Sequence, residues 1–183
     1  MNKDRVILEP ARFDLTLDRL SFELIEQYQD FQDCCMVGIQ PRGSVLADAL
    51  YDRLTKHYKI SDFPYGKIDI TFFRDDFRTR AKPLEADTNH IDFLIDSKRV
   101  ILVDDVLYTG RSVHAAMSAL QQYGRPERVE LLVLIDRRFN RHLPIHADYT
   151  GLQVDSLDKS YVSVDWNPKT GKHKILLFEE KAD

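Results

Sequence analysis

Cysteine and long apolar runs are scarce in this sequence. The 183 residues include two cysteines, Cys34 and Cys35, which are neighbours and have no third cysteine to pair with or to complete a metal site. No apolar run approaches the roughly 20 residues that span a bilayer, and residues 1–5 lack the apolar stretch of a signal peptide. We therefore expect a cytoplasmic protein without a membrane segment, with both thiols reduced in the core.

The sequence also has no excess of positive charge, and it has no segment with the composition of an interdomain linker. It carries 26 Lys and Arg against 30 Asp and Glu, a formal net charge of −4 at pH 7. A broad nucleic-acid-binding face normally shows clustered Lys and Arg, so the composition argues against one. Because no internal repeat, low-complexity tract or Pro/Gly/Ser-rich stretch is present, we expect one domain over residues 1–183.

The most informative segment reads RVILVDDVLYTGRS, over residues 99–112. Its first apolar residues, 100–103, are β-branched or aliphatic, which is typical of a strand buried on both faces of a parallel sheet. Asp104 and Asp105 come next, Gly110 follows in a short loop, and the apolar residues beyond it recur at helical spacing. The segment predicts a strand, an acidic turn, a glycine loop and a helix.

That order of elements suits a phosphorylated sugar. A loop that enters a helix N-terminus offers unpaired N–H groups and partial positive charge to a phosphate. Gly110 allows close approach of the backbone, Thr109 and Ser112 add hydroxyl donors, and Arg111 adds a cation. The two carboxylates upstream can accept hydrogen bonds from sugar hydroxyls. The predicted ligand therefore carries a phosphate and a cis-diol.

A second strand–loop–helix unit precedes this one. Residues 34–39 read as a buried strand, and a helix with leucines at 46, 50 and 54 follows the loop of residues 40–44. Arg42 supplies a fixed cation and Gly43 a small residue just before the helix, which again suits an anion.

The other elements expected are a helix over 14–31, a half-buried strand over 66–73, a short strand over 91–95, a buried strand over 129–135, and a C-terminal hairpin of 161–166 and 173–178. The buried strand ends in Asp136, Arg137, Arg138 and Phe139, at the sheet edge where open α/β sheets bind ligands.

The charged segment 74–90 is longer than the loops of most compact domains, so we interpret it as a lid. Its basic residues that could reach an anion on closure are Arg74, Arg78, Arg80 and Lys82.

The strand that ends in two acids, followed by Val106, Leu107, Tyr108 and Thr109-Gly110, resembles the 5-phosphoribosyl-1-pyrophosphate (PRPP) signature of type I phosphoribosyltransferases. The resemblance implies a single-domain α/β fold, with a central mostly parallel sheet flanked by helices, a lid loop and the C-terminal hairpin. It also implies that the acid pair holds the ribose 2′- and 3′-hydroxyls, and that the loop from Val106 to Ser112 cradles the 5′-phosphate. By the same resemblance Arg42 and Gly43 hold the pyrophosphate, and residues 136–139 recognise the base.

The residues that the resemblance places at the site are Arg42, Gly43, Asp104, Asp105, Val106, Leu107, Tyr108, Thr109, Gly110, Arg111, Ser112, Asp136 and Arg137. Of these, the acid pair and Arg42 are expected to take part in catalysis. No side chain is assigned as a metal ligand or as a general base.

Segments 68–76, 101–112, 124–126 and 143–149 together resemble the PyrR family over nearly the whole chain. This implies uracil phosphoribosyltransferase activity, which forms UMP and pyrophosphate from uracil and PRPP with Mg²⁺. It also implies a homodimer or a larger homo-oligomer. Several members of the family bind pyrimidine-operon messenger RNA in response to UMP and so control attenuation.

Two alternatives are open. An RNA-binding regulator is one, although Asp18, Phe22 and Gln27 replace the Thr, His and Arg of RNA-binding members on the first helix, and His146 and Leu152 replace basic residues elsewhere. Carboxylates repel phosphates, and each lost cation removes a counterion-releasing contact.

A purine phosphoribosyltransferase is the other alternative. Enzymes for hypoxanthine and guanine resemble this motif but have Asp where this chain has Tyr108, so the tyrosine favours a pyrimidine. A departure from the family's Lys-Thr at Gln40-Pro41 predicts weaker PRPP binding.

Overall fold

The computed structural model describes residues 4–75, 89–155, 160–167, 170 and 172–179. Its larger sheet has five strands in the order β3-β2-β4-β5-β6. All neighbouring strands in this sheet run parallel, which confirms the predicted fold class. The strands are β2 (Cys34–Ile39), β3 (Tyr65–Ile68), β4 (Arg99–Leu107), β5 (Arg128–Arg138) and β6 (Tyr149–Asp155).

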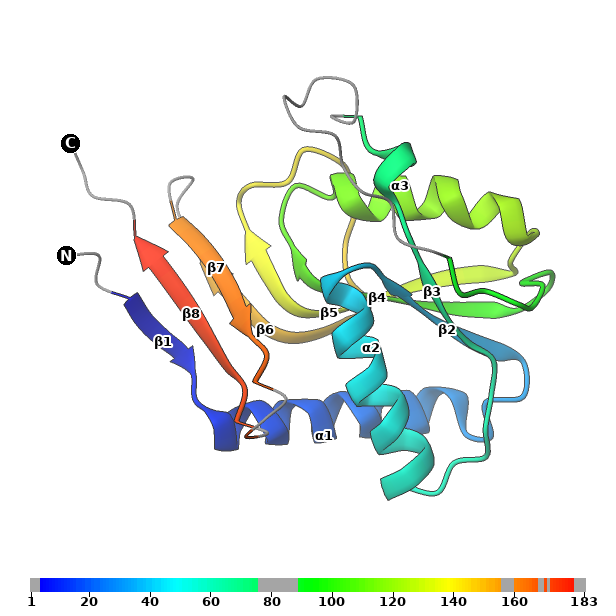
Figure 1. The fold of residues 1–183 in the computed structure, drawn as a ribbon, viewed down its shortest axis with the longest axis horizontal. Helices are drawn as coiled ribbons and strands as arrows, with labels where there is room; N and C mark the ends of the chain where they lie inside the picture. Colours follow the sequence, from blue (N-terminus) through cyan, green and yellow to red (C-terminus); the bar gives the residue numbers. More distant parts are fainter. Residues whose placement is uncertain (1–3, 76–88, 156–159, 168–169, 171, 180–183) are drawn as a thin grey trace.

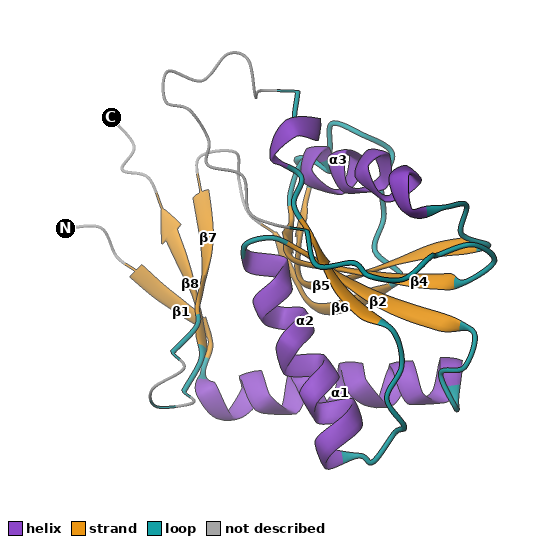
Figure 2. Ribbon diagram, turned by 45° about the vertical axis from the view of Figure 1, so that its right-hand side comes forward, coloured by secondary structure: helices purple, strands orange, loops and turns teal. Residues whose placement is uncertain are grey.

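Helices cover both faces of this sheet. Figure 2 shows α1 (Pro10–Tyr28) and α2 (Arg42–Asp52) on one face and α3 (Arg111–Leu120) on the other. A π-helical turn (Arg53–His57) extends α2, and short 3₁₀ turns lie at Thr71–Phe73 and Gln121–Tyr123.

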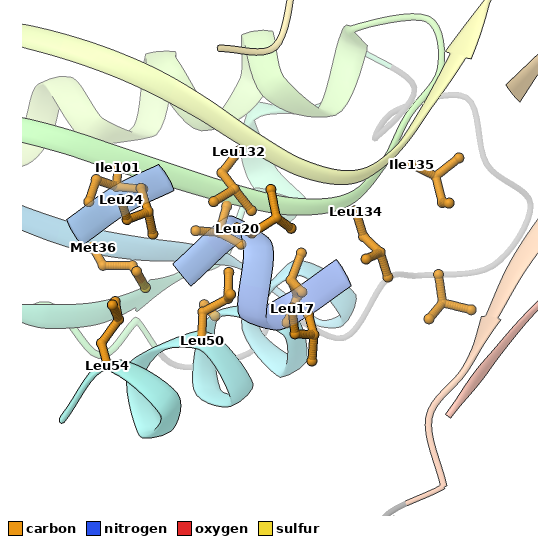
Figure 3. Close-up of a cluster of buried hydrophobic side chains, with 14 of the residues drawn as sticks. Leu17, Leu20, Leu24, Met36, Leu50, Leu54, Ile101, Leu132, Leu134 and Ile135 are labelled. Carbon is orange, nitrogen blue, oxygen red and sulfur yellow. The ribbon is translucent and has the colours of Figure 1, made fainter. Parts of the chain in front are cut away.

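The core lies in two layers because successive strand residues point to opposite faces of the sheet. Met36 and Leu132 pack with leucines of α1 and α2 (Figure 3), whereas their neighbours Val37 and Val133 pack with α3. Each fully buried leucine in such a core stabilises the fold by about 1.5–3 kcal/mol. The expected helix from 14 to 31 therefore buries the leucine face that its periodicity predicts.

The two cysteines follow the same alternation. Cys34 faces the α1 and α2 layer and Cys35 the α3 layer, and both are free and fully buried. Burial raises the pKa of each thiol to about 12, so neither is ionised at neutral pH. The prediction of reduced core thiols is confirmed.

A second, antiparallel sheet has the order β1-β8-β7, with β1 (Asp4–Leu8), β7 (Ser160–Asp165) and β8 (Lys174–Glu179). The predicted C-terminal hairpin is confirmed as β7 and β8. Figure 1 shows this sheet beside the carboxyl ends of the larger sheet, with α1 running along both. Neither β1 nor β6 was predicted.

The strand predicted over 66–73 is present as β3 but ends at Ile68, so its extension to residue 73 was wrong. The Asp69 side chain accepts hydrogen bonds from the backbone N–H of Thr71 at 2.7 Å and from its hydroxyl at 2.6 Å. Such local bonds compete with a strand ladder, and the chain turns into a 3₁₀ segment that leaves Phe72 exposed instead of on the buried face.

Residues 91–95 form no strand either; the pairing there is an isolated bridge between Lys67 and His90. The first helix begins at Pro10 and ends at Tyr28, so Phe31 is buried from outside it. Most of the expected lid, at 76–88, lies outside the described residues. Among the helices that the structure describes, none has the length and apolar character needed to cross a membrane.

Candidate active site

Two buried carboxylates mark the carboxyl edge of the larger sheet. Asp104 and Asp105 lie on β4, which continues to Leu107, and they are 7% and 6% exposed. The backbone N–H of Asp105 donates a 2.9 Å hydrogen bond to Asp104 Oδ1. Asp105 Oδ2 is buried and has no hydrogen-bond partner among the described residues. A buried acceptor that no described residue satisfies therefore lies at this edge.

The environment disfavours the charged form of both acids. Burial raises the pKa of Asp104 well above its usual range, and the charge of Asp105 raises it further, against the opposing charges of Arg74 and Arg42. Burial also raises the pKa of Asp105, and Arg42 opposes that shift. A ligand that donates hydrogen bonds to the pair, or carries positive charge, compensates for the lost solvation.

The glycine loop lies next to this pair. Gly110 has a φ of 90° and precedes α3, so it offers no side chain to cap the first N–H groups of the helix. The pocket here has a volume of about 180 Å³ and is lined by Arg74, Asp104, Val106, Leu107, Tyr108, Thr109, Gly110, Arg111, Ser112 and Val113. Of the residues predicted from the motif, this pocket contains Asp104 and the whole loop from Val106 to Ser112.

The second predicted loop approaches the pair from the other side. A Cβ on Gly43 would lie 2.5 Å from the carbonyl oxygen of Val103 and 2.8 Å from Asp104 Cα. Real Cβ atoms essentially never come this close, so only glycine fits between α2 and β4. Pro41, at the N-cap of α2, makes no side-chain cap hydrogen bond. Two helix N-termini therefore adjoin the acid pair.

Arg42 is the first residue of α2. Its Nη1 donates to the hydroxyl of Tyr161, in β7 of the second sheet, at 3.2 Å. This hydrogen bond is the main cause that raises the pKa of the guanidinium, and the charges of Asp105 and Asp104 add to it. The sequence placed Arg42 at the site but gave no signal for Tyr161, which lies 119 residues away.

The last residues of β5, Asp136 to Arg138, lie at the same edge, as predicted. Asp136 pairs in register with Leu107 of β4. Arg137 is 4% exposed, stacks its guanidinium 3.9 Å from the centre of the Tyr108 ring, and donates a 2.7 Å hydrogen bond to the carbonyl of Ser160. Asp136 and Arg137 are thus near the glycine loop.

Arg141 links the end of β5 to the glycine loop by hydrogen bonds, and it was not predicted from the sequence. It donates hydrogen bonds to the carbonyl of Tyr108 and to the carboxylate of Asp136. The backbone N–H groups of residues 142 and 143 donate to the carbonyl of Thr109 at 3.0 and 3.3 Å. These contacts hold the two segments in one arrangement.

The rim of the site carries charged and aromatic side chains. Arg111 pairs with Asp75. Phe139 is 79% exposed and has a φ of 76°, which is rare for a bulky residue. Next to it, Arg138 holds Asp155 with two hydrogen bonds of 2.6 and 2.7 Å. Within the described part of the chain, no cluster of three or more His, Cys, Asp or Glu side chains could hold a metal ion.

Comparison with known proteins gives the same picture as this geometry. The model of the phosphoribosyl transferase domain family matches residues 7–169. The protein named "Bifunctional protein PyrR" from Caldicellulosiruptor bescii is 41% identical over 177 residues, which cover 97% of this chain and 96% of the relative. The one from Enterococcus faecalis is 39% identical over 171 residues, which cover 93% and 94%. The chain belongs to the PyrR family of phosphoribosyltransferases.

Solved structures agree with this family at the level of the fold. The hypoxanthine phosphoribosyltransferase of Staphylococcus aureus matches with a TM-score of 0.68 and 17% identity, covering 93% of this chain and 90% of that one. The hypoxanthine phosphoribosyltransferase of Trypanosoma cruzi matches with a TM-score of 0.67 and 14% identity, covering 96% and 97%. The type I phosphoribosyltransferase fold predicted for this PyrR-family chain is confirmed.

Proposed function

We propose that this chain is a uracil phosphoribosyltransferase that forms UMP and pyrophosphate from uracil and PRPP. One observation carries the proposal: a buried pair of carboxylates lies between two helix N-termini, each of which begins with an arginine, Arg42 or Arg111. Such an arrangement suits a ligand with sugar hydroxyls in the middle and an anionic group at either end.

Asp104 and Asp105 receive the ribose hydroxyls in this proposal. Asp104 lines the pocket beside the glycine loop, and Asp105 follows it on β4 with a buried Oδ2 that no described residue bonds. The glycine loop takes the 5′-phosphate because the N–H groups at the start of α3 have no capping side chain from Gly110. The loop's position beside Asp104 matches the short separation between a ribose and its phosphate.

Arg42 and the start of α2 take the pyrophosphate. Mg²⁺ fits this end of the site because a hard cation prefers oxygen ligands and the residues nearby are carboxylates. Because this end of the site supplies few protein ligands, the oxygens of PRPP and water would complete the coordination of Mg²⁺. When bound, Mg²⁺ neutralises the charge of the leaving group.

The reaction is an in-line displacement at ribose C1, in which a uracil nitrogen attacks and pyrophosphate leaves. Positive charge develops on the ribose in the transition state, and the two carboxylates stabilise it at close range. Their raised pKa values reflect burial in a site that lacks that positive charge before reaction. Arg42 holds the departing pyrophosphate.

Tyr108 favours a pyrimidine over a purine. Position 108 carries a phenol in place of the carboxyl group that would protonate a purine. The Tyr108 ring stacks against the Arg137 guanidinium. The structural match to hypoxanthine enzymes extends to the fold alone. Phe139, exposed at the rim, supplies the ring against which we expect the base to stack.

The experiment is to incubate the chain with PRPP and Mg²⁺, add uracil or hypoxanthine, and follow pyrophosphate release. We expect release with uracil and none with hypoxanthine. Asp105→Asn should abolish turnover, whereas Asp48→Asn should not, because Asp48 pairs with Tyr65 and Lys67 away from both loops. Release with hypoxanthine would make the chain a purine enzyme, and unchanged turnover in Asp105→Asn would refute the site.

The family also provides a second candidate function, because its curated members are named bifunctional and the resemblance implies RNA-binding regulation. On α1, Asp18 accepts hydrogen bonds from Arg53 and from the hydroxyl of Tyr58, both at 3.1 Å, and Phe22 packs its ring 4.8 Å from that of Tyr58. This face offers a carboxylate and an apolar ring to a phosphate backbone. Binding of pyrimidine-operon leader RNA at low salt, with and without UMP, measures this role.

A further inference from the structure

A side chain of the second sheet, Tyr161, contacts the proposed site. Tyr161 lies at the amino end of β7, and its hydroxyl accepts the 3.2 Å hydrogen bond from Arg42 Nη1. The two residues come from different sheets. The contact therefore links the sheet that carries both chain ends to the loop that we assign to the pyrophosphate.

The Tyr161 ring is held in place from within its own sheet. Tyr161 pairs with Phe178 of β8 in register, and the two ring centres are 6.0 Å apart. The preceding residue is fixed as well, because the carbonyl of Ser160 accepts a hydrogen bond from the buried Arg137. The amino end of β7 is thus bonded to Arg42 on one side and to Arg137 of β5 on the other.

Both partners of this hydrogen bond lie at the surface, because Tyr161 is 50% exposed and Arg42 is exposed as well. An exposed arginine side chain loses considerable rotamer entropy when it binds an anion, and a fixed partner reduces that cost.

We propose that Tyr161 is a positioning residue for the pyrophosphate group, acting by holding the Arg42 guanidinium beside the acid pair. This inference rests on the proposed function, because it assumes that Arg42 binds pyrophosphate. It adds the second sheet to the machinery of the reaction and predicts that Tyr161 affects the pyrophosphate end of the substrate alone.

The test is calorimetric titration of the intact chain with three ligands in the presence of Mg²⁺: PRPP, pyrophosphate and UMP. Tyr161→Phe removes the hydroxyl and keeps the ring against Phe178. We expect affinity for PRPP and pyrophosphate to fall about tenfold, the size of one hydrogen bond to a charged group, and affinity for UMP to stay unchanged. A general loss of structure would weaken all three.

Tyr58→Phe is the matched control, since it removes a tyrosine hydroxyl that bonds to a charged partner, Asp18, away from both loops. It should leave all three affinities unchanged. A double-mutant cycle on PRPP affinity then tests the route through Arg42. In an Arg42→Ala background, Tyr161→Phe should cause no further loss.

Three outcomes would overturn the inference. Equal PRPP affinity in the wild type and Tyr161→Phe would remove the role of the hydroxyl, while UMP binding by both would leave the proposed function standing. A full tenfold loss in the Arg42→Ala background would mean that Tyr161 does not act through Arg42. Failure of the wild-type chain to bind either PRPP or UMP would refute the proposed function together with the inference.

Discussion

Replacing Asp104 with asparagine should make the unliganded protein more stable and the enzyme inactive. Burial and the neighbouring Asp105 raise the pKa of Asp104 in the folded state above its value in the unfolded chain. A group of this kind favours folding at low pH, and that contribution is lost as the pH rises through the folded-state pKa. At neutral pH the buried Asp104 therefore destabilises the fold relative to a residue that does not titrate.

Asparagine removes the charge and keeps the geometry. Its side-chain carbonyl can still accept the hydrogen bond from the backbone N–H of Asp105. Relief of a destabilising functional group typically adds about 0.5–2 kcal/mol to the free energy of unfolding. In a chain of 183 residues, each kcal/mol corresponds to roughly 2–4 °C in melting temperature, so we expect an increase of about 1–8 °C.

The assay is thermal unfolding of the unliganded wild type and Asp104→Asn between pH 4 and pH 8. The difference in melting temperature should be small near pH 4, where the unfolded-state aspartate is half protonated, and should grow as the pH rises. PRPP with Mg²⁺ should reverse the order, because a ligand at 100 times its Kd stabilises the wild type by about 2.7 kcal/mol and the variant binds it weakly.

Asp155→Asn is the control with the opposite sign. Hydrogen bonds from Arg138 lower the pKa of Asp155, so loss of that carboxylate should not raise the melting temperature. A melting temperature for Asp104→Asn equal to or below that of the wild type at pH 7.5 would refute the argument from burial.

Three further predictions concern the loops around the pair. Gly43→Ala should cost about 1–3 kcal/mol of folding free energy by overpacking against the carbonyl oxygen of Val103, and it should abolish turnover; a urea titration and the pyrophosphate assay measure the two effects. Arg141→Gln should raise the KM for PRPP more than it lowers kcat, because the glycine loop loses the hydrogen bonds that link it to Asp136. A KM equal to that of the wild type would show that the loop keeps its conformation without these bonds. Asp75→Asn should lower the KM for PRPP by at most about fivefold by freeing Arg111, and the gain should shrink at high salt; a higher KM would mean that the ion pair helps to form the site.

The parts of the site that are contiguous in sequence could be predicted. Asp104, Asp105 and Gly110 lie within one strand–loop–helix segment, and the carboxyl edge of a parallel sheet brings the Arg42 loop and Asp136 to the same place. The structure places all of these together. Arg141 and Tyr161 could not be found in this way, because Arg141 bonds to a backbone carbonyl 33 residues away and Tyr161 to a side chain 119 residues away.

The errors in the fold have physical causes, one of them local and the other tertiary. The alternation of residues 66–73 indicates a strand, but the Asp69 side chain bonds to the residue two positions later and turns the chain. In β6, Gly151 interrupts the strand pattern, because a Cβ there would lie 2.5 Å from the carbonyl oxygen of Leu134 in β5 and 3.0 Å from a Thr16 methyl group of α1. The reason for that glycine is tertiary, so its sequence neighbours carry no sign of it.

The pairing of β1 with β8 sets an order of assembly. During synthesis β1 leaves the ribosome before the other described strands, and its partner among them, β8, leaves after all of them. The parallel sheet, with Asp104 and Asp105 on β4 and Arg42 at the start of α2, can form before β1 pairs with β8. None of its strands belongs to the second sheet. Tyr161 reaches Arg42 only when β8 has joined β1 and β7. A nascent chain would therefore assemble its ribose site before its arginine is held in place.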